Sequence, residues 1–151
     1  MFDNKNVATL NSLIATTLDS VDGYRKAAEE ANAAQFREIF QSRANERQKL
    51  VSDFQAKVRE LGGEPEDDGT ILASAHRAFL GLRDKLTGAR DDDAVIAEVE
   101  RGEDHIKSKF ENALGDADLD ASVRQLIETG YASVREGHDQ MSALKHGLNA
   151  S

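Results

Sequence analysis

Apolar and small residues recur every three or four positions along four long stretches of the chain, a spacing that places each set on one face of an α-helix. The only proline, Pro65, lies outside these stretches, so none of them contains the residue that most strongly breaks helices. The stretches predict helices over residues 4–31, 34–61, 92–114 and 118–147, with a shorter amphipathic helix near 71–87.

Two helix ends carry specific sequence features. Gly62 and Gly63, followed closely by Pro65, predict the end of the second helix. Asp91–Asp93 provide an N-cap and carboxylates that suit the positive end of the helix dipole at the start of the third. These helix-end signals therefore agree with the helix boundaries that the apolar periodicity predicts.

The lengths of the connections predict the topology. Short turns join the first helix to the second and the third to the fourth, whereas about 30 residues separate the second from the third. Two antiparallel hairpins joined by one long crossover form a ferritin-like four-helix bundle. We therefore expect an all-α chain with a single domain over residues 1–151, whose crossover contains the short helix.

Charge and composition exclude several classes of function. The chain has 19 basic and 28 acidic residues, a net charge of −9, which disfavours binding to nucleic acid. It has no cysteine, so disulfides and thiolate metal sites are excluded. No apolar run approaches the ~20 residues of a membrane span, and no signal peptide is evident at the N-terminus. We expect a cytoplasmic protein that does not bind membranes.

Charged residues interrupt the apolar stripes near their middle. They are Arg43, Glu46 and Arg47 in the second helix, Glu100 and Glu103 in the third, and His138 in the fourth. A charge placed on the inner face of a bundle needs a partner or a metal, because burying a lone ion costs several kcal/mol.

A di-metal carboxylate site is one interpretation of these residues. Such a site takes one Glu from each of two helices and Glu-x-x-His from each of the other two. Here Lys49 stands three residues after Glu46, Arg135 stands three residues before His138, and the first helix has no Glu in its stripe. The candidate metal ligands are Glu46, Glu100, Glu103 and His138.

Axial position limits which candidates can meet. If the second hairpin turns symmetrically near residue 116, Glu103 is level with Gly130. His138 is then about 12 Å along the bundle from Glu103 and about 7 Å from Glu100. We prefer the other interpretation, a salt-bridge network in which Arg43 and Arg47 neutralise Glu46, Glu100 and Glu103 without a metal.

Several segments resemble an uncharacterised bacterial family of ferritin-like four-helix bundles, distantly similar to rubrerythrin. They are DGYRKAAEE (22–30), ANERQKL (44–50), LGGEPEDDGTILASAHRAF (61–79), VERGEDHIKSKFENAL (99–114) and the region of His138. The resemblance covers nearly the whole chain and implies the same crossover topology. It implies no activity, because the family has no assigned function.

Three functional hypotheses follow. We favour a non-enzymatic structural or interaction bundle with no cofactor, with a role in stress as one hypothesis. The alternatives are a ferritin-like di-metal oxidase, peroxidase or storage protein that holds iron or manganese, and a binder of small ligands. We also predict a homodimer, for which the apolar face of the crossover segment is a candidate interface (Leu72, Phe79, Leu82, Leu86).

Overall fold

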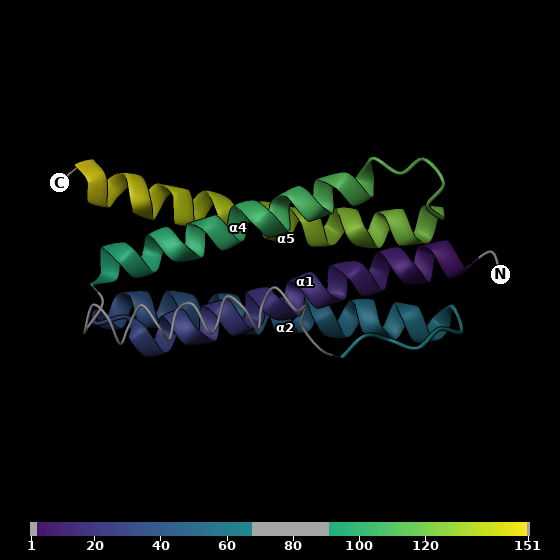
Figure 1. The fold of residues 1–151 in the computed structure, drawn as a ribbon, viewed down its shortest axis with the longest axis horizontal. Helices are drawn as coiled ribbons and strands as arrows, with labels where there is room; N and C mark the ends of the chain where they lie inside the picture. The colour runs from purple at the N-terminus through teal and green to yellow at the C-terminus, as the bar shows by residue number, and fades with distance from the viewer. Residues whose placement is uncertain (1–2, 68–90, 151) are drawn as a thin grey trace.

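The computed structural model describes residues 3–67 and 91–150, with side chains described over 5–67 and 91–147. These residues form four long α-helices and no strand: α1 (Asp3–Glu30), α2 (Ala34–Glu60), α4 (Asp92–Leu114) and α5 (Ala121–Ala150). Helices α1 and α2 form one antiparallel hairpin, and α4 and α5 form a second that packs along the first (Figure 1). The all-α bundle predicted from the sequence is confirmed. None of the four helices combines the length and apolarity that a membrane crossing needs.

Polar contacts at the two ends of the bundle establish the crossover. At one end, the Asp92 carboxylate accepts hydrogen bonds from the backbone amides of Asn32 (2.7 Å) and Ala33 (3.1 Å), in the turn between α1 and α2. At the other end, the Asn11 amide donates to the carbonyl of Glu64 (3.0 Å), just beyond the end of α2. Helix α2 therefore ends at the opposite end of the bundle from the start of α4, as the predicted crossover topology requires (Figure 1). The short helix predicted near 71–87, and with it the proposed dimer face, lies outside the described residues.

The helix ends lie where the sequence features predict them, with one exception. The αL conformation of Gly62 (φ 84°) and the bonds from Gly62 N to Arg59 O (3.0 Å) and from Gly63 N to Val58 O (2.9 Å) form a Schellman motif at the end of α2. Asp91 caps α4 by accepting from the amide of Ala94 at 2.9 Å.

The fourth helix was predicted to begin at residue 118, which is wrong by three residues. The Asp116 carboxylate folds back onto the amide of Asp118 (2.9 Å), and the Arg124 side chain donates to the carbonyls of Leu114 and Asp116. These bonds hold residues 115–120 as a non-helical loop. The first helical turn is closed only when the amide of Arg124 donates to the carbonyl of Asp120 at 2.8 Å.

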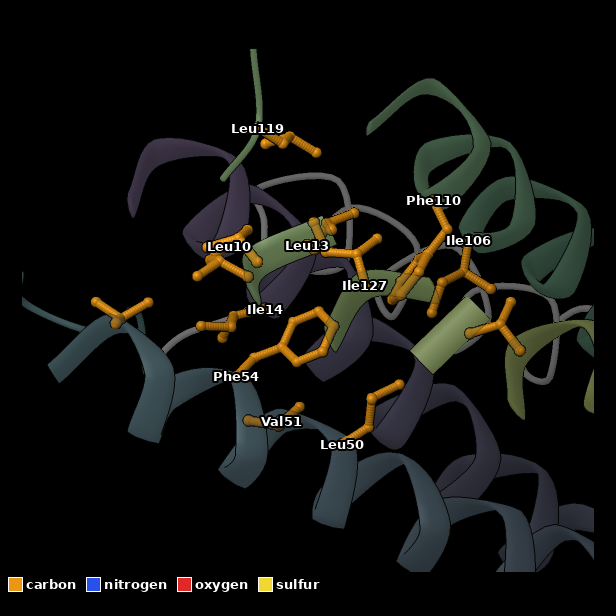
Figure 2. Close-up of a cluster of buried hydrophobic side chains, with 13 residues drawn as sticks. Leu10, Leu13, Ile14, Leu50, Val51, Phe54, Ile106, Phe110, Leu119 and Ile127 are labelled. Atoms are coloured by element: carbon orange, nitrogen blue, oxygen red, sulfur yellow. The ribbon is translucent and has the colours of Figure 1, made fainter. Parts of the chain in front are cut away.

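The apolar core consists of two clusters that lie one after the other along the bundle. The larger cluster is Leu10, Leu13, Ile14, Leu50, Val51, Phe54, Val58, Ile106, Phe110, Leu119, Val123, Ile127 and Val134 (Figure 2). The smaller cluster is Tyr24, Ala27, Ala28, Ala31, Phe40, Ala44, Val95, Ile96 and Met141. Between the two clusters lie Ser20 on α1, Arg47 on α2, Glu103 on α4 and Gly137 on α5, which belong to the site described next.

Helix α5 approaches the larger cluster closely at Gly130. A Cβ atom at this position would lie 2.9 Å from Leu50 Cδ1 and 3.1 Å from ring atoms of Phe54 and Phe110. The absence of a side chain at Gly130 therefore allows α5 to pack closely against α2 and α4.

Candidate functional site

The polar layer between the two core clusters is built around an ion pair of Arg47 from α2 and Glu103 from α4. Arg47 Nη1 donates to Glu103 Oε1 and Arg47 Nη2 donates to Glu103 Oε2, both at 2.7 Å. Both residues are fully buried, with relative exposures of 0% for Arg47 and 1% for Glu103. This two-point geometry is the strongest form of an arginine–carboxylate contact, because two parallel hydrogen bonds join the opposite charges.

Helix α1 provides two further contacts to this ion pair. Arg47 Nη1 also donates to Ser20 Oγ at 2.7 Å, and Arg47 Cζ lies 5.5 Å from the centre of the Tyr24 ring. A guanidinium at this distance from an aromatic face is attracted by the negative charge of the ring face. Three helices therefore hold the Arg47 side chain.

Burial and the Glu103 carboxylate together determine the protonation states of Arg47 and Tyr24. Burial disfavours the Arg47 cation, but the hydrogen bonds and negative charge of Glu103 outweigh it and raise the Arg47 pKa further. Burial, followed by the charge of Glu103, raises the Tyr24 pKa far above its usual value. At neutral pH the layer therefore contains a charged guanidinium and a neutral phenol.

Gly137 of α5 has no side chain, and the ion pair occupies the space that a side chain at this position would fill. A Cβ atom at Gly137 would lie 2.5 Å from Arg47 Nη2 and 2.9 Å from Glu103 Oε2. Glu103 is thus level with Gly137, and the predicted alignment with Gly130 is wrong by two helical turns. The prediction assumed a symmetrical turn near residue 116. Helix α5 begins only at Ala121, which accounts for part of this difference.

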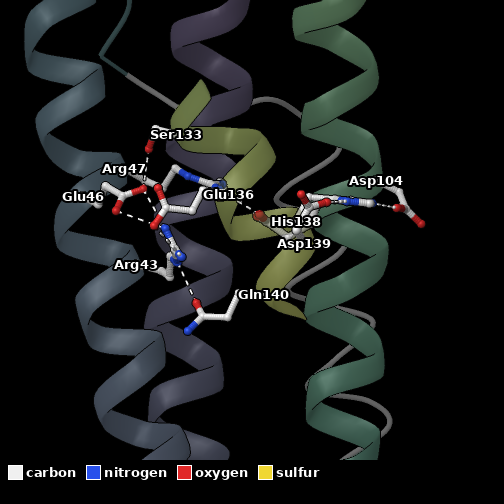
Figure 3. Close-up of polar contacts among 11 residues, drawn as sticks. Arg43, Glu46, Arg47, Asp104, Ser133, Glu136, His138, Asp139 and Gln140 are labelled. Atoms are coloured by element: carbon white, nitrogen blue, oxygen red, sulfur yellow. Dashed lines mark hydrogen bonds and ion pairs between the residues drawn. The ribbon is translucent and has the colours of Figure 1, made fainter. Parts of the chain in front are cut away.

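Arg43, one turn before Arg47, organises a second polar group between α2 and α5 (Figure 3). Arg43 Nη1 donates to Glu46 Oε1 and Oε2 at 3.0 and 3.1 Å, and Arg43 Nε donates to Gln140 Oε1 at 2.8 Å. The Ser133 hydroxyl also donates to Glu46. The contacts of Arg43 with Gln140 and of Glu46 with Ser133 thus join the two helices.

The other two predicted ligands lie in separate pairs. Glu100 Oε2 is 3.1 Å from Lys145 Nζ. His138 Nε2 lies 2.7 Å from Asp104 Oδ1, and His138 Nδ1 lies 3.3 Å from Asp139 Oδ1. Partial burial favours neutral His138, but the hydrogen bonds to the two aspartates outweigh it and raise the His138 pKa.

The four predicted ligands therefore do not meet in the structure. Among the described residues, no three His, Asp or Glu side chains are grouped so as to hold a metal ion. The polar contacts of these groups also involve residues that the sequence did not single out: Ser20, Gly137, Ser133, Asp104 and Gln140. Of these, Gly137 could have been found from the sequence, because it follows Gly130 by seven residues on the inner seam of α5.

Comparison with known proteins places the chain in a family. A family model described as a domain of unknown function, DUF2383, matches residues 5–116. The chain belongs to this family. No protein of curated function matches the sequence at a significant level.

Two solved structures share the fold at low sequence identity. One is described as ferritin-like, diiron-carboxylate proteins from Bacillus anthracis str. Ames, with a TM-score of 0.73, 15% identity and coverage of 96% of this chain and 98% of that one. The other is Dps from Thermosynechococcus elongatus, with a TM-score of 0.73, 14% identity and coverage of 95% and 91%. The ferritin-like bundle of this DUF2383 member is thereby established, as the crossover topology indicated.

The residues of the polar layer do not fit the di-metal site that the fold can carry. Both oxygens of Glu103 accept from Arg47, whose Nη2 fills the space beside Gly137. Two polar atoms of the layer, Arg47 Nε and Tyr24 Oη, are buried without a hydrogen-bond partner in the described part of the chain. Neither suits a cation, because the guanidinium N–H is only a donor and the phenol is held protonated. The layer carries its own positive charge.

Removal of one member of the ion pair is expected to destabilise the protein far more than removal of both. Arg47→Met leaves the Glu103 charge buried and should lower the free energy of unfolding by about 3–5 kcal/mol. Arg47→Met combined with Glu103→Leu removes both charges and should recover most of that loss. Urea denaturation with excess chelator measures both effects. A double variant no more stable than Arg47→Met would contradict this account of the layer.

The His138–Asp104 contact should make stability depend on pH. Because its pKa is raised in the folded protein, His138 stabilises fully below its unfolded pKa of about 6.5, and this contribution is lost as pH rises through the folded pKa. His138→Gln should therefore cost up to about 1 kcal/mol near pH 5.5 and much less at pH 8.5. His105→Gln, which alters an exposed histidine of α4, is the matched control for urea denaturation at both pH values. The same cost for His138→Gln at both pH values would refute this role.

Proposed function

We propose that this DUF2383 protein is a non-enzymatic four-helix bundle that acts by binding a partner. The observation that carries the proposal is the buried two-point contact between Arg47 and Glu103. It places a fixed cation and its counter-ion in the middle of the bundle, where a di-metal enzyme of this fold needs carboxylate and imidazole ligands. A binding function needs no such ligands.

The remaining candidate groups support the same proposal. Glu46, Glu100 and His138 are each engaged in an ion pair on a different part of the bundle. Assembling a metal site from them requires several of these pairs to break and their side chains to converge. The free energy of metal binding would have to offset that loss.

The alternative is a ferritin-like di-metal carboxylate protein that holds iron or manganese. Its support is the shared fold with the Bacillus anthracis structure, whose description names a diiron-carboxylate protein. At 15% identity this likeness establishes the fold alone. Fold does not determine chemistry, because unrelated sites occur on the same scaffold.

Thermal melting with and without metal separates the two functions. A ligand that binds only the folded state raises the melting temperature by mass action. We expect the same melting temperature with chelator, with Mn(II), and with Fe(II) under anaerobic conditions. A metal-dependent rise that Glu46→Ala or His138→Ala abolishes, and that Glu128→Ala on the exposed face of α5 retains, would establish the di-metal alternative instead.

Self-association is part of the proposal. We infer a homodimer, because an interaction bundle of this size commonly pairs through residual apolar surface. Light scattering at tens of micromolar protein should give twice the 16.5 kDa mass of one chain. A monomer mass throughout that concentration range would refute the dimer without affecting the account of the polar layer.

A further inference from the structure

An open groove of about 480 Å³ lies between α2 and α5, beside the polar layer. Its charged lining residues are Glu38, Arg43 and Glu46 from α2 and Glu136 from α5, and its neutral lining includes Ile39 and Ser42. Figure 3 shows four of its residues, Arg43, Glu46, Glu136 and Gln140, facing one another across the two helices. The volume lies in the range of ligand-binding clefts and would admit a few side chains.

Arg43 at the base of the groove is already engaged by groups of the protein itself. Its guanidinium donates to Glu46 and Gln140, and its Nη2 lies 3.7 Å from Glu136 Oε1. The residue is only 7% exposed. An anionic ligand would have to displace these contacts, so the groove does not suit a phosphate or carboxylate.

The charge of the groove favours a cation. Three carboxylates and one guanidinium leave two net negative charges, in a chain whose net charge is −9. Glu38 is exposed, and the Glu136 side chain is 74% exposed, so both can reach an incoming group. Surface fields of one sign attract partners of the opposite sign and accelerate their association.

The arrangement of the α2 residues also suits basic side chains. Glu38 and Glu46 are eight residues apart, which places them about 12 Å apart along the helix. Ile39 lies between them and is half-buried, so it offers an apolar surface on which the aliphatic stem of Lys or Arg can pack. A basic side chain can thus bury its stem on Ile39 while its charged end reaches Glu38 or Glu136.

We propose that the α2–α5 groove docks a lysine- or arginine-rich segment of a protein partner. This proposal rests on the proposed binding function, which it makes more specific. Glu38 and Glu136 provide the charge selection, and the contacts of Arg43 with Glu46 and Gln140 hold the base of the groove in shape.

Peptide binding tests the groove directly. The probe is a fluorescein-labelled 20-residue peptide of alanine and glutamine with lysine at every fourth position, and the matched probe has glutamate in place of each lysine. Fluorescence anisotropy compares the full-length wild type with Glu38→Gln/Glu136→Gln. Glu29→Gln/Glu128→Gln changes the net charge equally at two exposed sites outside the groove lining and is the control. Ser42→Trp fills the groove without changing its charge.

The lysine peptide should bind the wild type and the control with the same affinity within twofold. The affinity should fall about fivefold or more in Glu38→Gln/Glu136→Gln and in Ser42→Trp. The glutamate peptide should not bind. Equal weakening in the groove and control variants, binding of both peptides, or no binding to the wild type would each overturn the proposal.

The melting experiments distinguish a failure of the groove proposal from a failure of the proposed function. Metal-dependent stabilisation together with groove-selective peptide binding would refute the non-enzymatic function and leave the groove. Metal-independent stability without groove-selective binding would refute the groove alone.

Discussion

An arginine buried in a helix bundle stays charged, and its burial is costly unless an opposite charge lies in direct hydrogen-bond contact, a condition that Glu103 meets for Arg47. The pair joins α2 to α4, Ser20 and Tyr24 add α1, and Gly137 brings α5 against it. Because the contact requires these positions to be level, it fixes the relative register of the helices. The two apolar clusters on either side tolerate sliding more readily, since hydrophobic contact has no direction.

The same crossover bundle is found in a ferritin-like diiron-carboxylate structure and in Dps, at 15% and 14% identity. In this chain the middle of the bundle holds a guanidinium within hydrogen-bond distance of a carboxylate. Because the arginine side chain is part of the polypeptide, the positive charge that balances Glu103 is always present and does not depend on a supply of metal. Under the proposed binding function, the bundle presents its outer surfaces, including the acidic α2–α5 groove, to a partner.

Most of the fold could be predicted from the sequence, because the stripes of α1, α2 and α4 and the residues at Gly62 and Asp91 are local features. The contacts of the polar layer were harder to predict from the sequence. The pattern placed Arg47 and Glu103 on inner faces, but their pairing depends on the register between hairpins. Within the second hairpin, the 115–120 loop delays the start of α5 relative to α4, through side-chain bonds of Asp116 and Arg124 that periodicity does not encode. For the same reason the contact between His138 and Asp104 was not predicted.

The central claim is that Arg47 is the resident cation of the polar layer. Anomalous X-ray diffraction from crystals soaked in Mn(II) tests it most directly, because manganese can be located independently of the protein atoms. The account predicts no anomalous peak within the layer, with both hydrogen bonds between Arg47 and Glu103 intact. A manganese ion bound to Glu103, with the Arg47 side chain displaced from it, would contradict the account.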